Sequence, residues 1–280
     1  MTVKNAGEAG ENPLVPNAKL RQIYLKMLEA RKLDDVAVKR ATTAGRRRIA
    51  TIRGQEAIRV STLLELGEDD LISDTAPTAG MGWLLGGDRA RLLRGIAGTK
   101  SKPDTALLDA GCKRALGWIA DEEERLHLAL GAALALKAQG RQGIVIAYAR
   151  KDGMAEAAWR KTFSSAAKRA LPIIFVALPR PGAVRKGAEH NELCGAAHAA
   201  GIPGIPVDAC DSVALYRVIQ ESLGRTRGGD GPVLIEAVRW RMDGSPHGID
   251  DPLEHLKQFL LNRRICDTKW FSQAAKIKNR

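Results

Sequence analysis

Three residues with metal-ligating side chains recur at intervals of four: His190, Cys194 and His198. On a helix this spacing places side chains on one face, where imidazole and thiolate groups could hold a zinc ion. No fourth ligand is in view nearby. The alternative interpretation is a half-exposed helix face that carries one apolar cysteine, and we favour that alternative.

Clustered basic side chains are a second kind of candidate. Arg46–Arg48 together with Arg53 could receive a phosphate or an acidic partner. A solvated basic turn is the simpler interpretation, and the terminal run 276–280 is typical of a charged tail. The sequence contains no glycine-rich Walker loop, no dinucleotide-binding Gly-x-Gly-x-x-Gly after a strand and no Gly-x-Ser-x-Gly nucleophile elbow.

Composition limits what these residues can belong to. The chain has 280 residues, a formal net charge of +12 and 27% charged residues, a normal globular mix. Aromatic residues make up only 4%, too few for a base-stacking surface, so nucleic-acid binding is the least favoured reading of the charge. No apolar run reaches the roughly 18 residues of a membrane span. The four cysteines form no Cys-x-x-Cys pair, which favours reduced thiols and a cytoplasmic location.

The elements that must position these residues follow a regular rhythm in the second half. Apolar strands alternate there with helices, a pattern typical of a parallel sheet covered by helices on both faces. Strands are expected over 70–73, 143–148, 171–178, 205–207 and 232–238, and helices over 54–67, 121–140, 154–170, 191–200 and 211–225. Asn17 is expected to cap a first long helix, and 97–120 to be irregular. We therefore predict a flexible arm over 1–16 and a single α/β domain over 17–280.

Six stretches, in one order, carry a resemblance to a known family. They are Tyr24–Arg31, Gly54–Ala57 with Asp69 and Asp70, His127–Ala135, Phe163 with Leu171–Val176, Gly231–Glu236, and Asp251–Leu253 with Phe259 and Leu260. In this order they resemble the alpha subunit of the thiamine-diphosphate-dependent, decarboxylating component of 2-oxo acid dehydrogenase complexes, of the pyruvate, acetoin and branched-chain type. The resemblance implies a thiamine-diphosphate-binding-type α/β fold.

The resemblance also implies a cofactor, thiamine diphosphate, held through Mg²⁺. In the family an Asp of a Gly-Asp-Gly turn and an Asn about thirty residues later ligate the metal. The ungapped match places Lys151 on the metal-binding Asp, whereas a one-residue slip restores Asp152 and Gly153 as cofactor-binding residues, with Asp152 as metal ligand. The Asn position falls on Leu178–Arg180, where Pro179 offers no side-chain oxygen.

Other family motifs are replaced as well. The Tyr-Arg-Asp-His run that holds the diphosphate corresponds to Ala76–Ala79, followed by a retained Gly80. Thr99–Asp104 stands where a histidine-bearing loop is expected, and Trp118–Glu124 ends in four acids where the cofactor rings would lie. Packing features are kept and chemical features are lost, a pattern that indicates a degenerate cofactor site.

A remaining catalytic candidate lies near the C-terminus. The loop 243–252 contains His247, and in the family this region carries a histidine near the substrate. The alternative is a solvated turn rich in Gly, Pro and Asp.

The resemblance implies an alpha-type subunit that pairs with a beta-type subunit, in a heterotetramer or another oligomer. The implied reaction is oxidative decarboxylation of a 2-oxo acid with acyl transfer to a lipoyl group, and the beta chain supplies the acid that activates the cofactor. Whether this chain is itself part of an oxidoreductase stays open. The alternative is a non-catalytic structural or regulatory subunit that binds a beta-type partner or an anionic ligand.

Overall fold

The computed structural model describes residues 10–45, 48–98, 102–179, 192–238 and 251–276. Its centre is a sheet of five strands in the order β1-β2-β3-β5-β4, and every neighbouring pair is parallel. The strands are β1 (Leu71–Ser73), β2 (Val145–Arg150), β3 (Ile173–Leu178), β4 (Gly204–Asp208) and β5 (Val233–Val238). The predicted α/β class with a mainly parallel sheet is confirmed.

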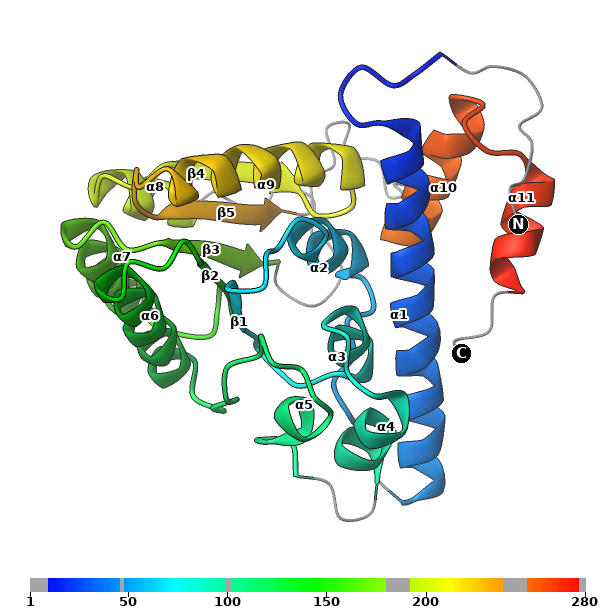
Figure 1. Ribbon diagram of the computed structural model, residues 1–280, viewed down its shortest axis with the longest axis horizontal. Helices are drawn as coiled ribbons and strands as arrows, with labels where there is room; N and C mark the ends of the chain where they lie inside the picture. Colours follow the sequence, from blue (N-terminus) through cyan, green and yellow to red (C-terminus); the bar gives the residue numbers. More distant parts are fainter. Residues whose placement is uncertain (1–9, 46–47, 99–101, 180–191, 239–250, 277–280) are drawn as a thin grey trace.

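Helices cover both faces of this sheet, as Figure 1 shows. Side chains of a strand alternate between the two faces, so β2, β3 and β5 each contribute to two separate apolar clusters. Ala147 and Phe175 pack toward α6 (Glu122–Ala138), α7 (Glu156–Lys168) and α8 (Glu192–Ala199). Ile146 and Val176 belong to the cluster on the other face, with α1 (Asn17–Thr43), α2 (Glu56–Leu63) and α9 (Ser212–Arg227). The central strands are therefore apolar on both sides.

The long helix α1 runs along one side of the molecule, and the shorter helices lie beside it or beside its neighbours (Figure 1). These are α3 (Ala79–Leu84), α4 (Arg89–Ala97), α5 (Ala106–Asp109), α10 (Pro252–Asn262) and α11 (Thr268–Ala275). Tyr24 of α1 lies with its ring centroid 5.7 Å from that of Trp270 and 5.0 Å from that of Phe271. This aromatic group holds the C-terminal helix against the first one.

Aspartate side chains begin several helices as predicted. Asp121 accepts a hydrogen bond from the backbone N–H of Glu124, and Asp211 and Asp251 cap α9 and α10 in the same way. Asn17 is an exception, because α1 already begins at Asn17 and has no side-chain cap. Its side-chain oxygen instead accepts from the N–H of Asn12.

The N-terminal segment is described from residue 10 onward. Val15 is fully buried against the core, and the side chain of Asn12 accepts from the N–H groups of Leu14 and Val15. The division into an arm over 1–16 and a domain over 17–280 stays a prediction. Within the described ranges, no helix has the length and apolar character needed to cross a bilayer.

Candidate functional site

A buried ion pair joins the carboxyl ends of β2 and β5, the edge on which the sequence places the cofactor. Nζ of Lys151 lies 3.0 Å from Oε1 of Glu236, and the two side chains are 6% and 0% exposed. The other oxygen, Oε2, accepts a hydrogen bond of 2.8 Å from the N–H of Cys194 at the start of α8. Both carboxylate oxygens of Glu236 are thus engaged by groups of this chain.

The side chain of Cys194 lies beside the same carboxylate, and its thiol stays neutral. Burial, followed by the hydrogen bond and the charge of Glu236, raises the pKa of the Cys194 thiol to about 12. The thiol therefore stays protonated at neutral pH, whereas a metal ligand must be a thiolate. His198, one turn later on the same helix, is exposed, and His190 lies outside the described residues, so the predicted set of three ligands is not tested.

A second ion cluster closes the turn that follows β2. Oε1 of Glu122 accepts from the N–H of Arg150 at 2.7 Å and lies 2.6 Å from Nη2 of Arg125. Glu122 and Arg125 are both buried, whereas the side chain of Arg150, also paired with Glu122, is 55% exposed. Of the four consecutive acids, Glu122 is therefore buried beside its counter-charges, whereas Asp121 caps α6 from an exposed position.

Gly153 lies directly against Glu122. A Cβ at Gly153 would fall 2.6 Å from Cδ of Glu122, so this glycine is needed for the close approach. Its neighbour Asp152 lies exposed in the turn after β2. Among the residues that the structure describes, no three His, Cys, Asp or Glu side chains gather as a metal site requires.

The retained Gly80 has a packing role. Its N–H donates to Oδ1 of Asp34 at 2.6 Å, and a Cβ there would lie 2.8 Å from the carbonyl oxygen of Ala30. Oδ2 of Asp34 accepts from the N–H of Ile52 at 2.7 Å. Burial raises the pKa of Asp34 to about 6, against the lowering effect of these two hydrogen bonds. Sequence reasoning missed Asp34, although an acid between Leu33 and Ala37 on the apolar face of α1 is a usable signal.

A third polar cluster, also missed, lies after β1. Arg59 is buried, forms an ion pair with Asp74 and places its guanidinium 4.1 Å from the ring centroid of Tyr148. Nε1 of Trp118 donates to the carbonyl oxygen of Thr75 at 3.0 Å. These contacts engage Asp74 and Thr75, which directly precede Ala76–Ala79, the segment that corresponds to the diphosphate-binding run.

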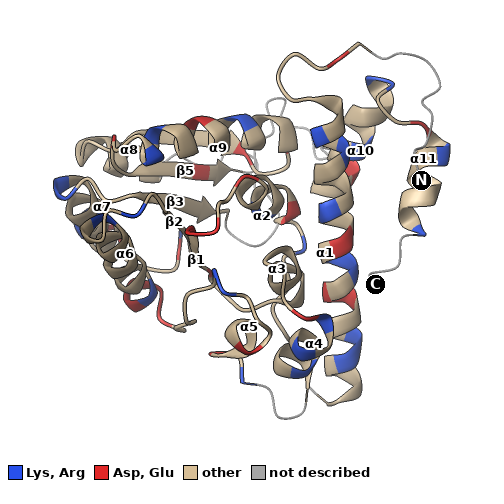
Figure 2. Ribbon diagram, viewed as in Figure 1, with Lys and Arg blue, Asp and Glu red and all other residues tan. Residues whose placement is uncertain are grey.

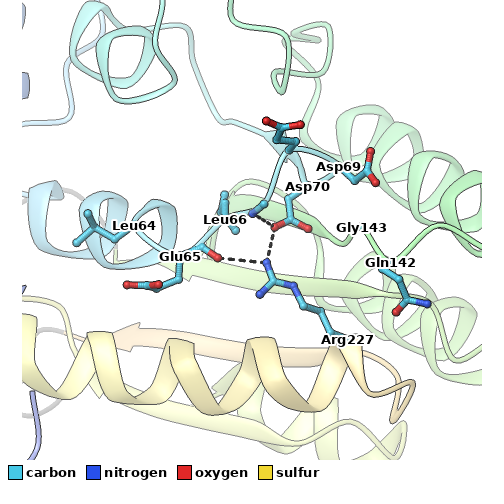
Figure 3. Close-up of a pocket in the computed structure, with 10 residues that line it drawn as sticks. Leu64, Glu65, Leu66, Asp69, Asp70, Gln142, Gly143 and Arg227 are labelled. Carbon is cyan, nitrogen blue, oxygen red and sulfur yellow. Dashed lines mark hydrogen bonds and ion pairs between the residues drawn. The ribbon is translucent and has the colours of Figure 1, made fainter.

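A pocket of about 450 Å³ lies at the opposite, amino-terminal edge of the sheet. Its wall includes residues 64–70, and Figure 3 shows the guanidinium of Arg227 directed at Asp70 and at the carbonyl oxygen of Glu65. Asp70 also accepts from the N–H groups of Gly67 and Ile144. These internal partners give the charged groups of the pocket a structural role.

The remaining candidates from the sequence are His247 and the basic cluster Arg46–Arg48 with Arg53. His247, Arg46 and Arg47 lie outside the described residues. Arg53 forms an exposed ion pair with Asp35, both side chains being 54% exposed, in agreement with a solvated turn.

A parallel sheet covered by helices on both faces defines a doubly wound α/β protein. The model of the dehydrogenase E1 component family matches residues 24–258, and the chain belongs to this family. The resemblance inferred from the six motifs is thereby confirmed.

Curated relatives point the same way. The chain is 34% identical over 133 residues to the pyruvate dehydrogenase E1 component subunit alpha of Staphylococcus aureus strain Mu50, a match that covers 45% of this chain and 35% of that protein. The chain thus spans about a third of that relative's length in this match. It is 27% identical over 254 residues to the 3-methyl-2-oxobutanoate dehydrogenase subunit alpha of Mycobacterium tuberculosis strain CDC 1551 / Oshkosh, covering 89% of this chain and 68% of that protein.

A solved structure of a proposed thiamin diphosphate-dependent enzyme from Mycobacterium smegmatis is a more distant likeness. Its TM-score is 0.42 at 15% identity, with 68% of this chain and 32% of that chain covered. The assignment rests on the family match.

Proposed function

We propose that this chain is an alpha-type subunit of a 2-oxo acid dehydrogenase-like assembly in which ion pairs of the chain itself have replaced the magnesium and thiamine diphosphate site. Its role is to associate with a beta-type subunit, and the chain is non-catalytic by itself. The observation that carries the proposal is the buried pair between Lys151 and Glu236.

The donor set at the strand ends does not fit a divalent metal. Mg²⁺ requires oxygen ligands in near-octahedral geometry. Lys151 brings an ammonium group to this place, and Glu236 already uses one oxygen for that ammonium and the other for the N–H of Cys194. A metal ion there would meet a buried cation at short range, which is strongly unfavourable in a medium of low polarity. Pro179, at the end of β3, is buried and adds no side-chain oxygen.

The turn after β2 supports the same conclusion. The carboxylate of Glu122 fills the space beside Gly153, so an anionic diphosphate would approach a negative group there. The two cations nearby, Arg125 and Arg150, already pair with this carboxylate. Asp152 remains as an oxygen donor in this turn, and it would be the metal ligand if the site still worked. No reaction step is assigned to this chain through the cofactor.

Calorimetric titration with thiamine diphosphate and Mg²⁺ tests the proposal. The chain is titrated alone and together with a beta-type subunit, beside the alpha and beta pair of the Staphylococcus aureus relative as the positive control. We expect saturable binding by the control pair and none by this chain in either form. Stoichiometric, Mg²⁺-dependent binding by this chain would overturn the proposal and point to Asp152.

The net charge of +12 favours the second candidate, a subunit that holds an anionic ligand. A titration with thiamine diphosphate in EDTA distinguishes the two. Binding without a divalent metal, weakened by Arg150→Ala, would support an anion site at the strand ends. The same measurement with inorganic pyrophosphate shows whether the phosphate groups alone are recognised.

A further inference from the structure

The end of the molecule formed by α4 and the last turns of α1 is strongly basic. The helix α4 contains Arg89, Arg91 and Arg94 and no acid. The last turns of α1 contain Lys39 and Arg40 and again no acid. The two helices pack against each other, and Figure 2 shows their blue segments side by side. Folding therefore gathers on one surface cations that are far apart in the sequence.

The cations on this surface are not compensated by acids of the described residues. The side chains of Lys39, Arg40, Arg91 and Arg94 are exposed, and none of them forms an ion pair with a described acid. The neighbouring Asp88 instead accepts a hydrogen bond from the backbone N–H of Arg91, as the cap of α4. On α7 and α9, by contrast, exposed arginines pair with a glutamate one turn away. The four cations are therefore available to an anionic partner.

Exposed apolar side chains lie at the same end of the molecule. Val36 and Val38 of α1 are 40% and 39% exposed, and Leu108 of α5, a helix that packs on α4, is 45% exposed. The described residues include six large apolar side chains as exposed as these, and three of the six are here. Asp104 and Asp109 flank Leu108, but the cations of α1 and α4 outnumber them. Cations mixed with exposed apolar groups are typical of a surface that lies in the interfacial region of a bilayer.

A bilayer of anionic phospholipids complements this surface better than other polyanions do. Its phosphates suit guanidinium groups, and its interfacial region accepts valine and leucine side chains, which gain nothing from a nucleic-acid backbone. No aromatic side chain lies in α4, α5 or the last turns of α1, so bases would have no stacking partner there. An acidic protein would need a matching shape, whereas a flat bilayer needs only an accessible end of the molecule. Figure 1 shows α4, α5 and the end of α1 together at such an end.

We propose that the surface defined by Lys39, Arg40, Arg91 and Arg94 binds the face of membranes rich in anionic phospholipids. Each cation near such a membrane strengthens binding about fivefold, and clusters of about four to eight cations are typical of this recognition. The attraction fades within a Debye length, so the association is reversible and depends on salt. The surface does not include the strand ends, so the proposal is independent of whether the cofactor site is lost.

Co-sedimentation of the full chain with lipid vesicles measures this binding. At about 0.05 M salt we expect binding to vesicles of phosphatidylcholine with about 30% phosphatidylserine and none to phosphatidylcholine alone, and at about 0.5 M salt we expect the binding to be lost. Arg91→Ala combined with Arg94→Ala should weaken binding about twenty-fivefold. Lys161→Ala combined with Lys168→Ala is the matched control, because both lysines are exposed on α7, which covers the face of the sheet away from α1. A wild-type chain that does not bind at low salt, or two double variants that are weakened equally, would overturn the proposal.

Soluble polyanions distinguish a membrane surface from a general anion-binding surface. Leu108→Ser should weaken vesicle binding severalfold, because the leucine enters the interfacial region, and it should leave binding to duplex DNA unchanged. Leu14→Ser is the control, since Leu14 is 55% exposed but precedes the opposite end of α1. Duplex DNA or poly-glutamate that bound more tightly than the vesicles, with the same dependence on Arg91 and Arg94, would show a nucleic-acid or protein surface and overturn the proposal.

Discussion

Two of the buried carboxylates in this fold, Asp34 and Glu236, are stabilised by different kinds of partner. Asp34 lies between α1 and α3 and is held by the N–H groups of Ile52 and Gly80. Glu236 lies in the sheet and is held by an ammonium group together with one N–H. Burial raises the pKa of Asp34 to about 6, so Asp34 is still mostly ionised at pH 7 and takes up a proton only as the pH falls through 6.

The difference between the partners of Asp34 and those of Glu236 indicates the role of Lys151. Two backbone donors leave the Asp34 carboxylate mostly ionised at neutral pH although its pKa is raised, whereas Glu236 in the sheet has a full counter-charge beside it. Where the family resemblance implies a metal ion, this chain has its own cation. On the proposed function, Lys151 supplies positive charge at the strand ends in place of that metal ion.

Removing the internal cation should have the largest effect. Lys151→Met leaves Glu236 buried without a counter-charge, and we expect the free energy of unfolding to fall by about 3–5 kcal/mol in urea titrations. Lys151→Met combined with Glu236→Gln should recover much of the loss, because the amide oxygen still accepts from the N–H of Cys194. A double variant as unstable as the single one would show that the pair is not a charge-compensating unit.

The Asp34 side of the comparison predicts a pH dependence. Its folded-state pKa is raised from 3.8 to about 6, so the folded chain binds the proton more tightly than the unfolded chain. The resulting stabilisation is fully present below about pH 4 and is lost as the pH rises through 6, a change of about 3 kcal/mol. The difference between the unfolding curves of wild type and Asp34→Asn from pH 3.5 to 7 isolates this contribution. Asp35→Asn, at an exposed neighbour, should leave the slope unaltered.

Gly80→Ala sharpens the packing half of the comparison. The added Cβ would lie 2.8 Å from the carbonyl oxygen of Ala30, and backbone must move to admit it. We expect a loss of about 1–3 kcal/mol in the free energy of unfolding. Gly224→Ala in α9, where a Cβ meets nothing, should be neutral or slightly stabilising. Equal effects of the two substitutions would contradict the close contact of α1 with α3.

The smallest effect is expected at the exposed cation of the second cluster. Arg150→Ala removes a partner whose side chain is 55% exposed, while Arg125 still compensates Glu122. We expect a loss below about 1 kcal/mol in thermal or urea unfolding. A loss as large as that of Lys151→Met would erase the distinction between buried and exposed counter-charges.

Much of the fold follows from local sequence. The strands over 143–148, 171–178 and 232–238 are apolar runs, and Asp121, Asp211 and Asp251 stand where helices begin, so both signals are readable without the structure. The three short helices between residues 79 and 109 are not predicted. Gly80, Gly82, Gly86 and Gly87 lower the helix propensity there, and packing against α1 determines the outcome.

For the candidate site, too, the sequence indicated residues but not their contacts. The sequence left Lys151 and Asp152 as alternatives at the metal-binding position and marked Gly80 as retained, but it gave neither Lys151 nor Gly80 its contacts. Glu236 follows Lys151 by 85 positions, and Gly80 follows Asp34 by 46, so no spacing rule connects them. The roles of Asp152, Gly153 and His247 in cofactor binding or catalysis stay predictions.

By itself the sequence determined the family and the parallel α/β class, because these depend on local patterns and on the order of motifs. Only the tertiary structure decided which charge compensates which. The ammonium of Lys151, the carboxylate of Glu236 and the N–H of Cys194 come from three separate places, the turn after β2, β5 and α8. The ends of parallel strands meet only after the crossover helices have brought them to one edge of the sheet.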